Sequence, residues 1–257
     1  MVIIMDYEVN LARTLDCGQA FRWTSDENGL WSGIVGAESL SVSQDDLSPV
    51  RDNEFWSNYF DMGFDYPGAI EELSSTGEVM RKAAEFSSGI QILNQDPWEA
   101  LCSFIISQNN NIKRIRLIIT RLSKGGLFPS PEEILDIGVE GLRELGLGFR
   151  DRYVFDAALK VHQGDIDLEE LKTMDVSSAT ERLKTIYGVG DKVASCALLY
   201  GFHRFECFPM DVWMKRVMAD MFDGMDGKKL FGPLAGLAQQ YLFFYARECF
   251  YKEGQHE

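Results

Sequence analysis

Cysteine and histidine, from which most protein zinc and iron–sulfur sites are built, are scarce in this sequence. The 257 residues include five cysteines and three histidines, and no two cysteines are separated by two residues. Scattered cysteines in odd number predict free thiols in a reducing compartment, cytoplasmic, or nuclear if the source is eukaryotic. The same scarcity predicts that the protein has no catalytic metal centre.

Long hydrophobic runs and an excess of positive charge are also missing. No apolar stretch approaches the roughly 20 residues of a membrane helix, and the first residues lack the pattern of a signal peptide. The formal net charge is −15, which is unfavourable for binding nucleic acid. Residues 1–99 account for most of it, with 5 basic and 18 acidic side chains.

The rest of the chain is nearly neutral, with 20 basic and 22 acidic side chains, and no acid lies between Glu99 and Glu132. The basic residues of that interval are Lys113, Arg114, Arg116, Arg121 and Lys124. They form either a solvated helix face or a nucleic-acid contact.

The hydrophobic pattern divides the chain into two parts. "QAFRW", "LWSGIV" and "ESLSVS", within residues 19–43, predict three antiparallel strands. After residue 96 amphipathic segments predict helices, including separate ones for "SPEEILDI" and "GVEGLRELG". We therefore expect an α+β fold, with an N-terminal α+β domain over residues 1–90 and an all-helical domain over residues 91–257.

The segment "ERLKTIYGVGDKVASCALLYG" predicts a helix–hairpin–helix motif. Gly188 and Gly190 flank Val189, and glycine permits the positive φ values that so short a reversal requires. Backbone N–H groups at the start of the second helix would form a cradle for a phosphate. Because any helical hairpin can use glycine in this way, the segment alone is compatible with either DNA binding or a purely structural turn.

Lys192 lies at the start of the second helix, where the helix dipole disfavours a cation by up to about 1 kcal/mol. Either this side chain extends into solvent, or the site requires a lysine that can lose its proton and act as a nucleophile. Cys196 follows four residues later and shares the same helix face. That cysteine could equally be a small core residue.

Asp211, in "FPMDVWMKRV", occupies the position of a helix N-cap. As a cap alone it would contribute about 1 kcal/mol and need no other role. A carboxylate held by backbone N–H groups stays ionised, however. It could then stabilise positive charge on a sugar or move protons for the lysine.

The hairpin followed by this aspartate resembles the helix–hairpin–helix DNA glycosylase superfamily, and more closely its 8-oxoguanine DNA glycosylase/AP lyases. Seven blocks in order carry the resemblance: "CGQAFRW" (17–23), "WSG" (31–33), "DPWEALCSFIISQNNNIKRI" (96–115), "LGLGFRDRY" (145–153), "GVGDKVASC" (188–196), "PMDV" (209–212) and "GLAQQYLF" (236–243). Together they extend over nearly the whole chain.

The resemblance implies roles for the residues that act on the sugar and the base. Lys192 would be the nucleophile and Asp211 the catalytic carboxylate. The backbone carbonyl of Gly18 would accept a hydrogen bond from the N7–H that 8-oxoguanine has and guanine lacks. One missing bond to a buried acceptor costs about 1–3 kcal/mol, which is enough for discrimination.

The resemblance also implies a pocket for the extruded base. Cys196 and Phe243 would lie on its two faces, and Gln239 would bond its Watson–Crick edge. Gln239 and Phe243 are four residues apart, as expected for two side chains on one helix face.

The DNA around the extruded base would be held by a further group. Asn109 would fill the gap left in the duplex, Arg114 and Arg150 would bond the unpaired cytosine, and Phe149 would stack beside it. Two positions depart from the family pattern. Phe149 stands where tyrosine is common, and Trp213 stands where relatives often have histidine, so a phosphate contact there is not carried over.

These features predict a monomeric, bifunctional 8-oxoguanine DNA glycosylase that acts on double-stranded DNA. Lys192 would attack C1′ of the flipped nucleotide, form an imine and cut the strand 3′ to the lesion by β-elimination. We expect no cofactor, although the resemblance allows a monovalent cation at the hairpin carbonyls near residues 185–190.

Two alternatives differ in their chemistry. A monofunctional alkylbase glycosylase would use water, so Lys192 argues against it. A non-catalytic DNA-binding scaffold is mildly favoured by the acidic net charge.

Overall fold

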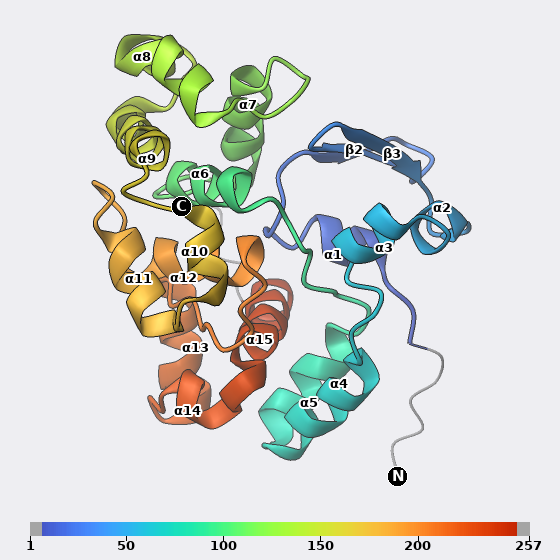
Figure 1. Cartoon of the computed structure of the whole chain (residues 1–257). Coiled ribbons are helices and arrows are strands. Elements are labelled where there is room, and N and C mark those ends of the chain that lie inside the picture. Colours follow the sequence, from blue (N-terminus) through green and yellow to red (C-terminus); the bar gives the residue numbers. More distant parts are fainter. Residues whose placement is uncertain (1–6, 251–257) are drawn as a thin grey trace.

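A computed structural model, which describes residues 7–250, places a small antiparallel sheet beside a larger body of helices (Figure 1). The sheet has the order β1 (Trp23–Ser25), β2 (Trp31–Val35), β3 (Glu38–Val42). Trp23 lies opposite Gly33, and a Cβ added to Gly33 would collide with the indole ring. The α+β prediction is therefore confirmed.

Three short helices cover the sheet: α1 (Leu11–Leu15), α2 (Ser48–Arg51) and α3 (Glu54–Tyr59). The small core between them is aromatic, with Trp23 and Trp56 edge to face at 5.9 Å between ring centroids. The indole N–H of Trp23 donates to the hydroxyl of Tyr59 at 2.9 Å, so this ring is buried without losing its hydrogen bond.

Helices α4 (Tyr66–Ser75) and α5 (Glu78–Phe86) follow the sheet in sequence but pack elsewhere. Their buried residues belong to the same hydrophobic cluster as the long C-terminal helix α15 (Ala235–Cys249), which lies beside α5 (Figure 1). The small core thus comes mainly from residues 9–60, with Leu93 added, whereas the helical core contains Cys17 and Phe21 as well as residues from Tyr66 onward. The domain boundary at residue 90 stays a prediction.

Helix α6 (Pro97–Ile106) runs through the middle of the helical body and is buried along most of its length. It begins with Asp96 as N-cap, whose side chain accepts from the backbone N–H of Glu99 at 2.8 Å. The hairpin helix α12 (Asp191–Gly201) packs against it, with Phe104 and Tyr200 stacked at 5.1 Å.

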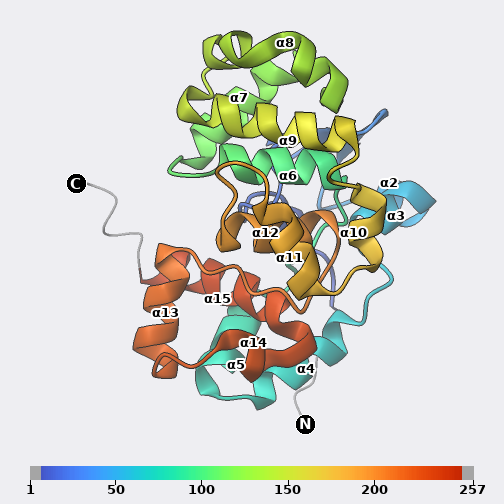
Figure 2. The ribbon, with the colours of Figure 1, turned by 60° about the vertical axis from the view of Figure 1, so that its left-hand side comes forward.

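The other helices surround α6 and α12 in two groups, visible in two orientations (Figures 1 and 2). One group is α7 (Ile112–Leu122), α8 (Pro131–Glu144) and α9 (Asp151–Gln163). The other is α10 (Leu168–Thr173), α11 (Val176–Lys184), α13 (Val212–Phe222) and α14 (Gly227–Phe231). Short 3-10 turns lie at Gly148–Arg150 and Gly232–Leu234. No helix within residues 7–250 is long and apolar enough to cross a bilayer.

One predicted element differs from the observed one. The first strand begins at Trp23 instead of residue 19, because the buried side chain of Gln19 bonds backbone groups of distant residues. The two helices expected over residues 130–146 are confirmed as the two parts of α8, which is interrupted at Gly138 by a non-helical φ of 70°. That glycine explains why the sequence resembles two helices.

Candidate active site and nucleic-acid interface

The hairpin between α11 and α12 has the geometry that its glycines predict. Gly188 has a φ of +79°, and a Cβ there would collide with the ring of Tyr153 from α9. Gly190 meets no atom within 4 Å of an added Cβ, so the backbone there is open to the surface. Helix α12 has no side-chain cap, which leaves its first-turn N–H groups available to an external acceptor such as a phosphate.

Side chains of helix α9 bind two backbone groups of this hairpin. The carboxylate of Asp156 accepts from the backbone N–H of Tyr187 at 2.7 Å and pairs with Lys160 at 3.0 Å. The ammonium of Lys160 in turn donates to the carbonyl of Thr185. One carbonyl of the 185–190 segment therefore already has a cationic partner within the chain.

Lys192 is directed inward between α12 and α6, not out into solvent. Its Nζ is 3.5 Å from the hydroxyl of Ser107 and 5.4 Å from the centroid of the Phe104 ring. The residue is half-buried. The amine is thus held by a weak hydrogen bond and an aromatic face, an arrangement in which it can act on a molecule that enters from the surface.

Cys196 and Asp211 lie within electrostatic reach of each other and of this lysine. Burial raises the pKa of the Cys196 thiol, and the charge of Lys192 partly opposes that shift, while Asp211 adds to it. The Asp211 carboxylate also accepts from the backbone N–H of Met214 at 2.8 Å, so it caps α13 as expected. Capping occupies one oxygen of this half-buried carboxylate.

The Gly18 turn has a conformation that favours glycine, with φ +95°. Next to it, Gln19 is completely buried. Its amide donates to the carbonyls of Thr14 at 2.9 Å and Gln91 at 2.8 Å, and its oxygen accepts from the N–H of Leu93 at 2.9 Å. These bonds hold the backbone on one side of the Gly18 carbonyl in a single orientation.

Helix α15 carries the two residues expected to contact a base. Gln239 is 5% exposed, and its side-chain oxygen has no hydrogen-bond partner within residues 7–250. Phe243 lies one turn further on and is half-buried. The neighbouring Gln240 accepts from the hydroxyl of Tyr200 at 2.6 Å. An unpaired buried amide oxygen is costly, so the position suits a ligand that supplies a donor.

The Asn109 loop, between α6 and α7, depends on Arg150. Asn109 is exposed and has a left-handed φ of +47°. Arg150 is 3% exposed, and its guanidinium donates to the carbonyls of Gln108 and Asn109, the latter at 2.7 Å. This arginine, expected to face a cytosine, is in the described structure directed at the loop.

Phe149 and Arg114 present the exposed surface of the same region. The Phe149 ring is 51% exposed and lies 4.3 Å from the Arg150 guanidinium. Arg114 is exposed, with a long contact of 3.5 Å to the carbonyl of Gly146. Burial first, and then the positive charge of Arg114, lower the pKa of Arg150.

The sequence interpretation missed Arg247, and it named Arg116 only as part of the basic stretch; the two side chains meet at Asp16. Arg116 of α7 pairs with the Asp16 carboxylate at 2.6 Å, and Arg247 of α15 contacts the Asp16 carbonyl at 3.5 Å. No local pattern could reveal these contacts, because they join residues about 100 and 231 positions apart.

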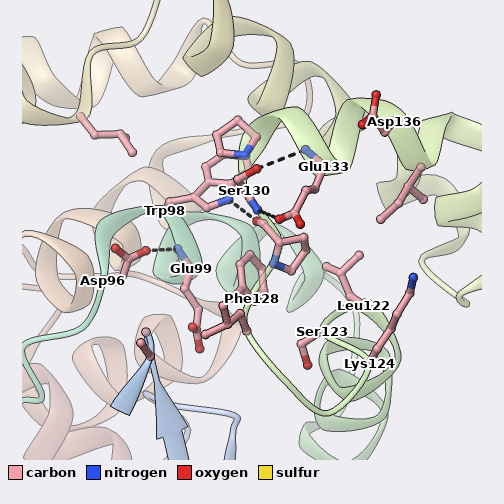
Figure 3. A pocket seen from close by; sticks show the side chains of 17 residues that line it. Asp96, Trp98, Glu99, Leu122, Ser123, Lys124, Phe128, Ser130, Glu133 and Asp136 are labelled. Carbon is pink, nitrogen blue, oxygen red and sulfur yellow. Dashed lines mark hydrogen bonds between the residues drawn. The ribbon is translucent and has the colours of Figure 1, made fainter.

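A groove of about 980 Å³ lies apart from all these residues, between the β2–β3 turn, the start of α6 and the segment from α7 to α8 (Figure 3). Trp98, Phe128 and Ser130 line it, together with Glu99. None of the residues predicted for the site belongs to it, so the groove and the site are separate features.

Within residues 7–250, no cluster of histidine, cysteine and acidic side chains could hold a metal ion. Four of the cysteines, Cys17, Cys102, Cys196 and Cys207, are buried free thiols.

Comparison with known proteins covers almost the entire chain. Residues 1–101 match the family model of the 8-oxoguanine DNA glycosylase N-terminal domain, and residues 102–229 match that of the HhH-GPD superfamily base excision DNA repair proteins. The N-glycosylase/DNA lyase of Saccharomyces cerevisiae is 30% identical over 255 residues, which is 82% of this chain and 67% of that protein.

Two solved structures share the fold. One is MBOgg1 in complex with a low-affinity DNA ligand, at 38% identity and a TM-score of 0.86, covering 93% of this chain and 92% of that one. The other is the Clostridium acetobutylicum 8-oxoguanine glycosylase/lyase with DNA that contains cytosine opposite 8-oxoG, at 33% identity and 0.85, with the same coverage.

Proposed function

We propose that this chain is a bifunctional glycosylase and lyase acting on 8-oxoguanine in duplex DNA. The premise is that the chain belongs to the 8-oxoguanine DNA glycosylase family of the helix–hairpin–helix superfamily. The observation that carries the proposal is the inward Lys192, held by Ser107 and Phe104 beside Cys196 and Asp211. A glycosylase that used only water would have no need of an amine at this position.

The reaction follows from that arrangement. The damaged nucleotide is turned out of the duplex at a cost of a few kcal/mol. The uncharged amine of Lys192 attacks C1′, and the bond from C1′ to the base breaks with its electron pair going to the base. The Asp211 carboxylate stabilises the positive charge that develops on the sugar.

The lyase step uses the same lysine. The attacking nitrogen gives up two protons, one to the departed base and one to the ring oxygen O4′ as the sugar ring opens, which leaves an imine between Nζ and C1′. This imine acidifies the C2′ proton, and its removal expels the 3′ phosphate by β-elimination. Water then hydrolyses the imine and frees the lysine.

Base recognition is assigned to groups from both ends of the chain. The Gly18 carbonyl accepts from N7–H of 8-oxoguanine, and the buried oxygen of Gln239 accepts a donor of the base edge. Cys196 and Phe243 contact the two base faces. Guanine has no N7–H, so it leaves a buried carbonyl unpaired at a cost of about 1–3 kcal/mol.

Contacts with the rest of the DNA complete the proposal. The N–H groups of Gly188 and Gly190 and of the first turn of α12 surround a phosphate. The N–H of Val189, which the sequence also suggested for this cradle, instead donates to the carbonyl of Ile186 at 3.0 Å. Asn109 fills the space of the extruded base, and Arg114 reads the opposite cytosine beside Phe149. We propose a monomer acting in the compartment that holds the DNA, the cytoplasm or the nucleus.

A monovalent cation is compatible with the hairpin, because backbone carbonyls are oxygen ligands of the kind that alkali cations take. Thr185 already has the Lys160 ammonium as partner, so the cation would use other carbonyls of residues 185–190. When bound, it would supply a positive charge beside the phosphate.

Borohydride trapping tests the central proposal. The protein is incubated with an 8-oxoguanine:cytosine duplex and with the undamaged duplex, and borohydride reduces any imine to a stable amine. We expect a covalent protein–DNA product and strand cleavage with the damaged duplex alone. Base release without trapping would support the monofunctional alternative, and binding without base release would support a scaffold.

A further inference from the structure

Arg247 contacts both parts of the chain that form the proposed base pocket, helix α15 and the segment before Gly18. It lies in the last turn of α15, one turn beyond Phe243, and its guanidinium is 6.0 Å from the Phe243 ring and 5.3 Å from the Phe244 ring. Both terminal nitrogens of the same guanidinium are 3.5 Å from the carbonyl oxygen of Asp16, two residues before Gly18.

We infer that Arg247 is a positioning residue for base recognition, because it sets the Gly18 turn at a defined distance from the face of α15 that carries Gln239 and Phe243. This inference rests on the proposed function. It assigns no contact between Arg247 and the DNA.

Other contacts also hold the turn, among them the hydrogen bond from the Gln95 side chain to the carbonyl of Gln19 at 2.9 Å. On its C-terminal side Gln19 is bound to three backbone groups, as described above. On its N-terminal side the contacts at Asp16 come from Arg116 of α7, through the carboxylate, and from Arg247, through the carbonyl. Of these anchors, Arg247 alone lies on the helix that carries Gln239 and Phe243.

The electrostatic environment of Cys17 agrees with this geometry. Burial raises the pKa of its thiol to about 11, and the charge of Arg247 is among the influences that oppose the shift. The positive charge of Arg247 therefore acts directly on the residue between Asp16 and Gly18. A guanidinium also suits the place for a steric reason, since its flat surface covers an aromatic ring while its edge donates to a carbonyl.

The test compares Arg247→Met with a matched control, Arg204→Met. Arg204 is similarly exposed, at 20% of its side chain against 26% for Arg247. It also donates to one distant carbonyl, that of Met174 at 2.7 Å, and pairs with a nearby carboxylate, that of Glu206 at 2.6 Å. The control removes the same kinds of interaction away from the pocket.

Three rates are measured at saturating enzyme under single-turnover conditions: excision of 8-oxoguanine, excision of guanine, and trapping on a duplex with a preformed abasic site. Because Arg247→Met removes a hydrogen bond from a charged group, we expect it to slow 8-oxoguanine excision about 10- to 100-fold. The abasic-site rate should stay at the wild-type value, because that substrate has no base to recognise. Arg247→Lys should recover part of the loss.

Several results would overturn the inference. Excision of 8-oxoguanine by Arg247→Met at the wild-type rate is one, and an equal loss for Arg204→Met is another. A parallel loss of trapping on the abasic duplex would show that Arg247 acts on the lysine or on folding. If the wild-type protein itself excised nothing, the proposed function would fail instead, so the two failures are distinguishable.

Discussion

The groups proposed to perform the chemistry and the groups proposed to select the base are built in different ways. Lys192, Cys196 and Asp211 lie within 20 residues of one another and are placed by the starts of two helices. Gly18 and Gln239 come from opposite ends of the chain, and the contact of Arg247 with Asp16 joins the two segments that carry them. The proposed reacting groups are therefore close together in the sequence, whereas the proposed selecting groups depend on how the two ends of the chain pack.

Replacing Lys192 should distinguish the proposed reacting groups from the DNA-binding groups most strongly. Lys192→Gln removes the nucleophile, so we expect no strand cleavage and no borohydride trapping. Binding to the damaged duplex should remain, because the phosphate cradle consists of backbone N–H groups. Trapping of this variant at the wild-type rate would show that another amine is the nucleophile.

Replacing Asp211 should lower the reaction rate less than replacing Lys192 does. Asp211→Asn keeps a side chain that can cap α13, so the melting temperature should barely change. The lost negative charge should lower the single-turnover rate by roughly 100-fold. A large loss of stability with nearly normal activity would reduce Asp211 to a helix cap.

Arg114, in the first turn of α7, tests selectivity alone. Arg114→Met should relax the preference for cytosine opposite 8-oxoguanine by a factor that corresponds to about 1–3 kcal/mol, while the Lys192 chemistry continues. Excision rates opposite C, A, G and T measure this. Equal wild-type rates on all four duplexes would contradict a reading role.

Arg150→Met is the informative companion to that variant. Because Arg150 donates to the carbonyls of Gln108 and Asn109, its loss should slow excision opposite all four bases. A change confined to the duplex with cytosine would instead mean that Arg150 turns outward to the base in the complex.

The smallest effect concerns stability at a position outside the site. Burial raises the pKa of Glu99 from 4.5 to about 7, against the opposing charge of Arg22 at 2.9 Å. The folded protein thus binds this proton more tightly than the unfolded chain does. The resulting stability is fully present below about pH 4.5 and is lost as the pH rises through 7.

Glu99→Gln cannot ionise, so its melting temperature relative to wild type should rise between pH 4.5 and 7. For a chain of this size, the melting temperature is expected to rise by about 2–4 °C for each kcal/mol added to the free energy of unfolding. The cleavage rate should not change, because Glu99 lines the separate groove (Figure 3). A difference in melting temperature that does not vary with pH would contradict the raised pKa.

Local signals in the sequence were sufficient for the helix geometry around the proposed reacting groups. The cap formed by Asp211 and the shared helix face of Lys192 and Cys196 depend on atoms within about four residues along the chain. The inward direction of Lys192 depends instead on Ser107 and Phe104 of α6. The three-stranded meander and the helical part followed from periodicity in the same way. The one glycine at 138 even explains why α8 was expected as two helices.

Other features could be known only from the tertiary structure, because long-range contacts determine them. The tertiary structure placed α4 and α5 in the core of the helical body, began β1 at Trp23, and turned Arg150 towards the Asn109 loop. It also brought Arg247 to Asp16. Each outcome depends on a buried surface or a hydrogen bond between residues far apart in the chain. Such pairings are chosen by the packing of the whole core and leave no periodic or local trace in the sequence.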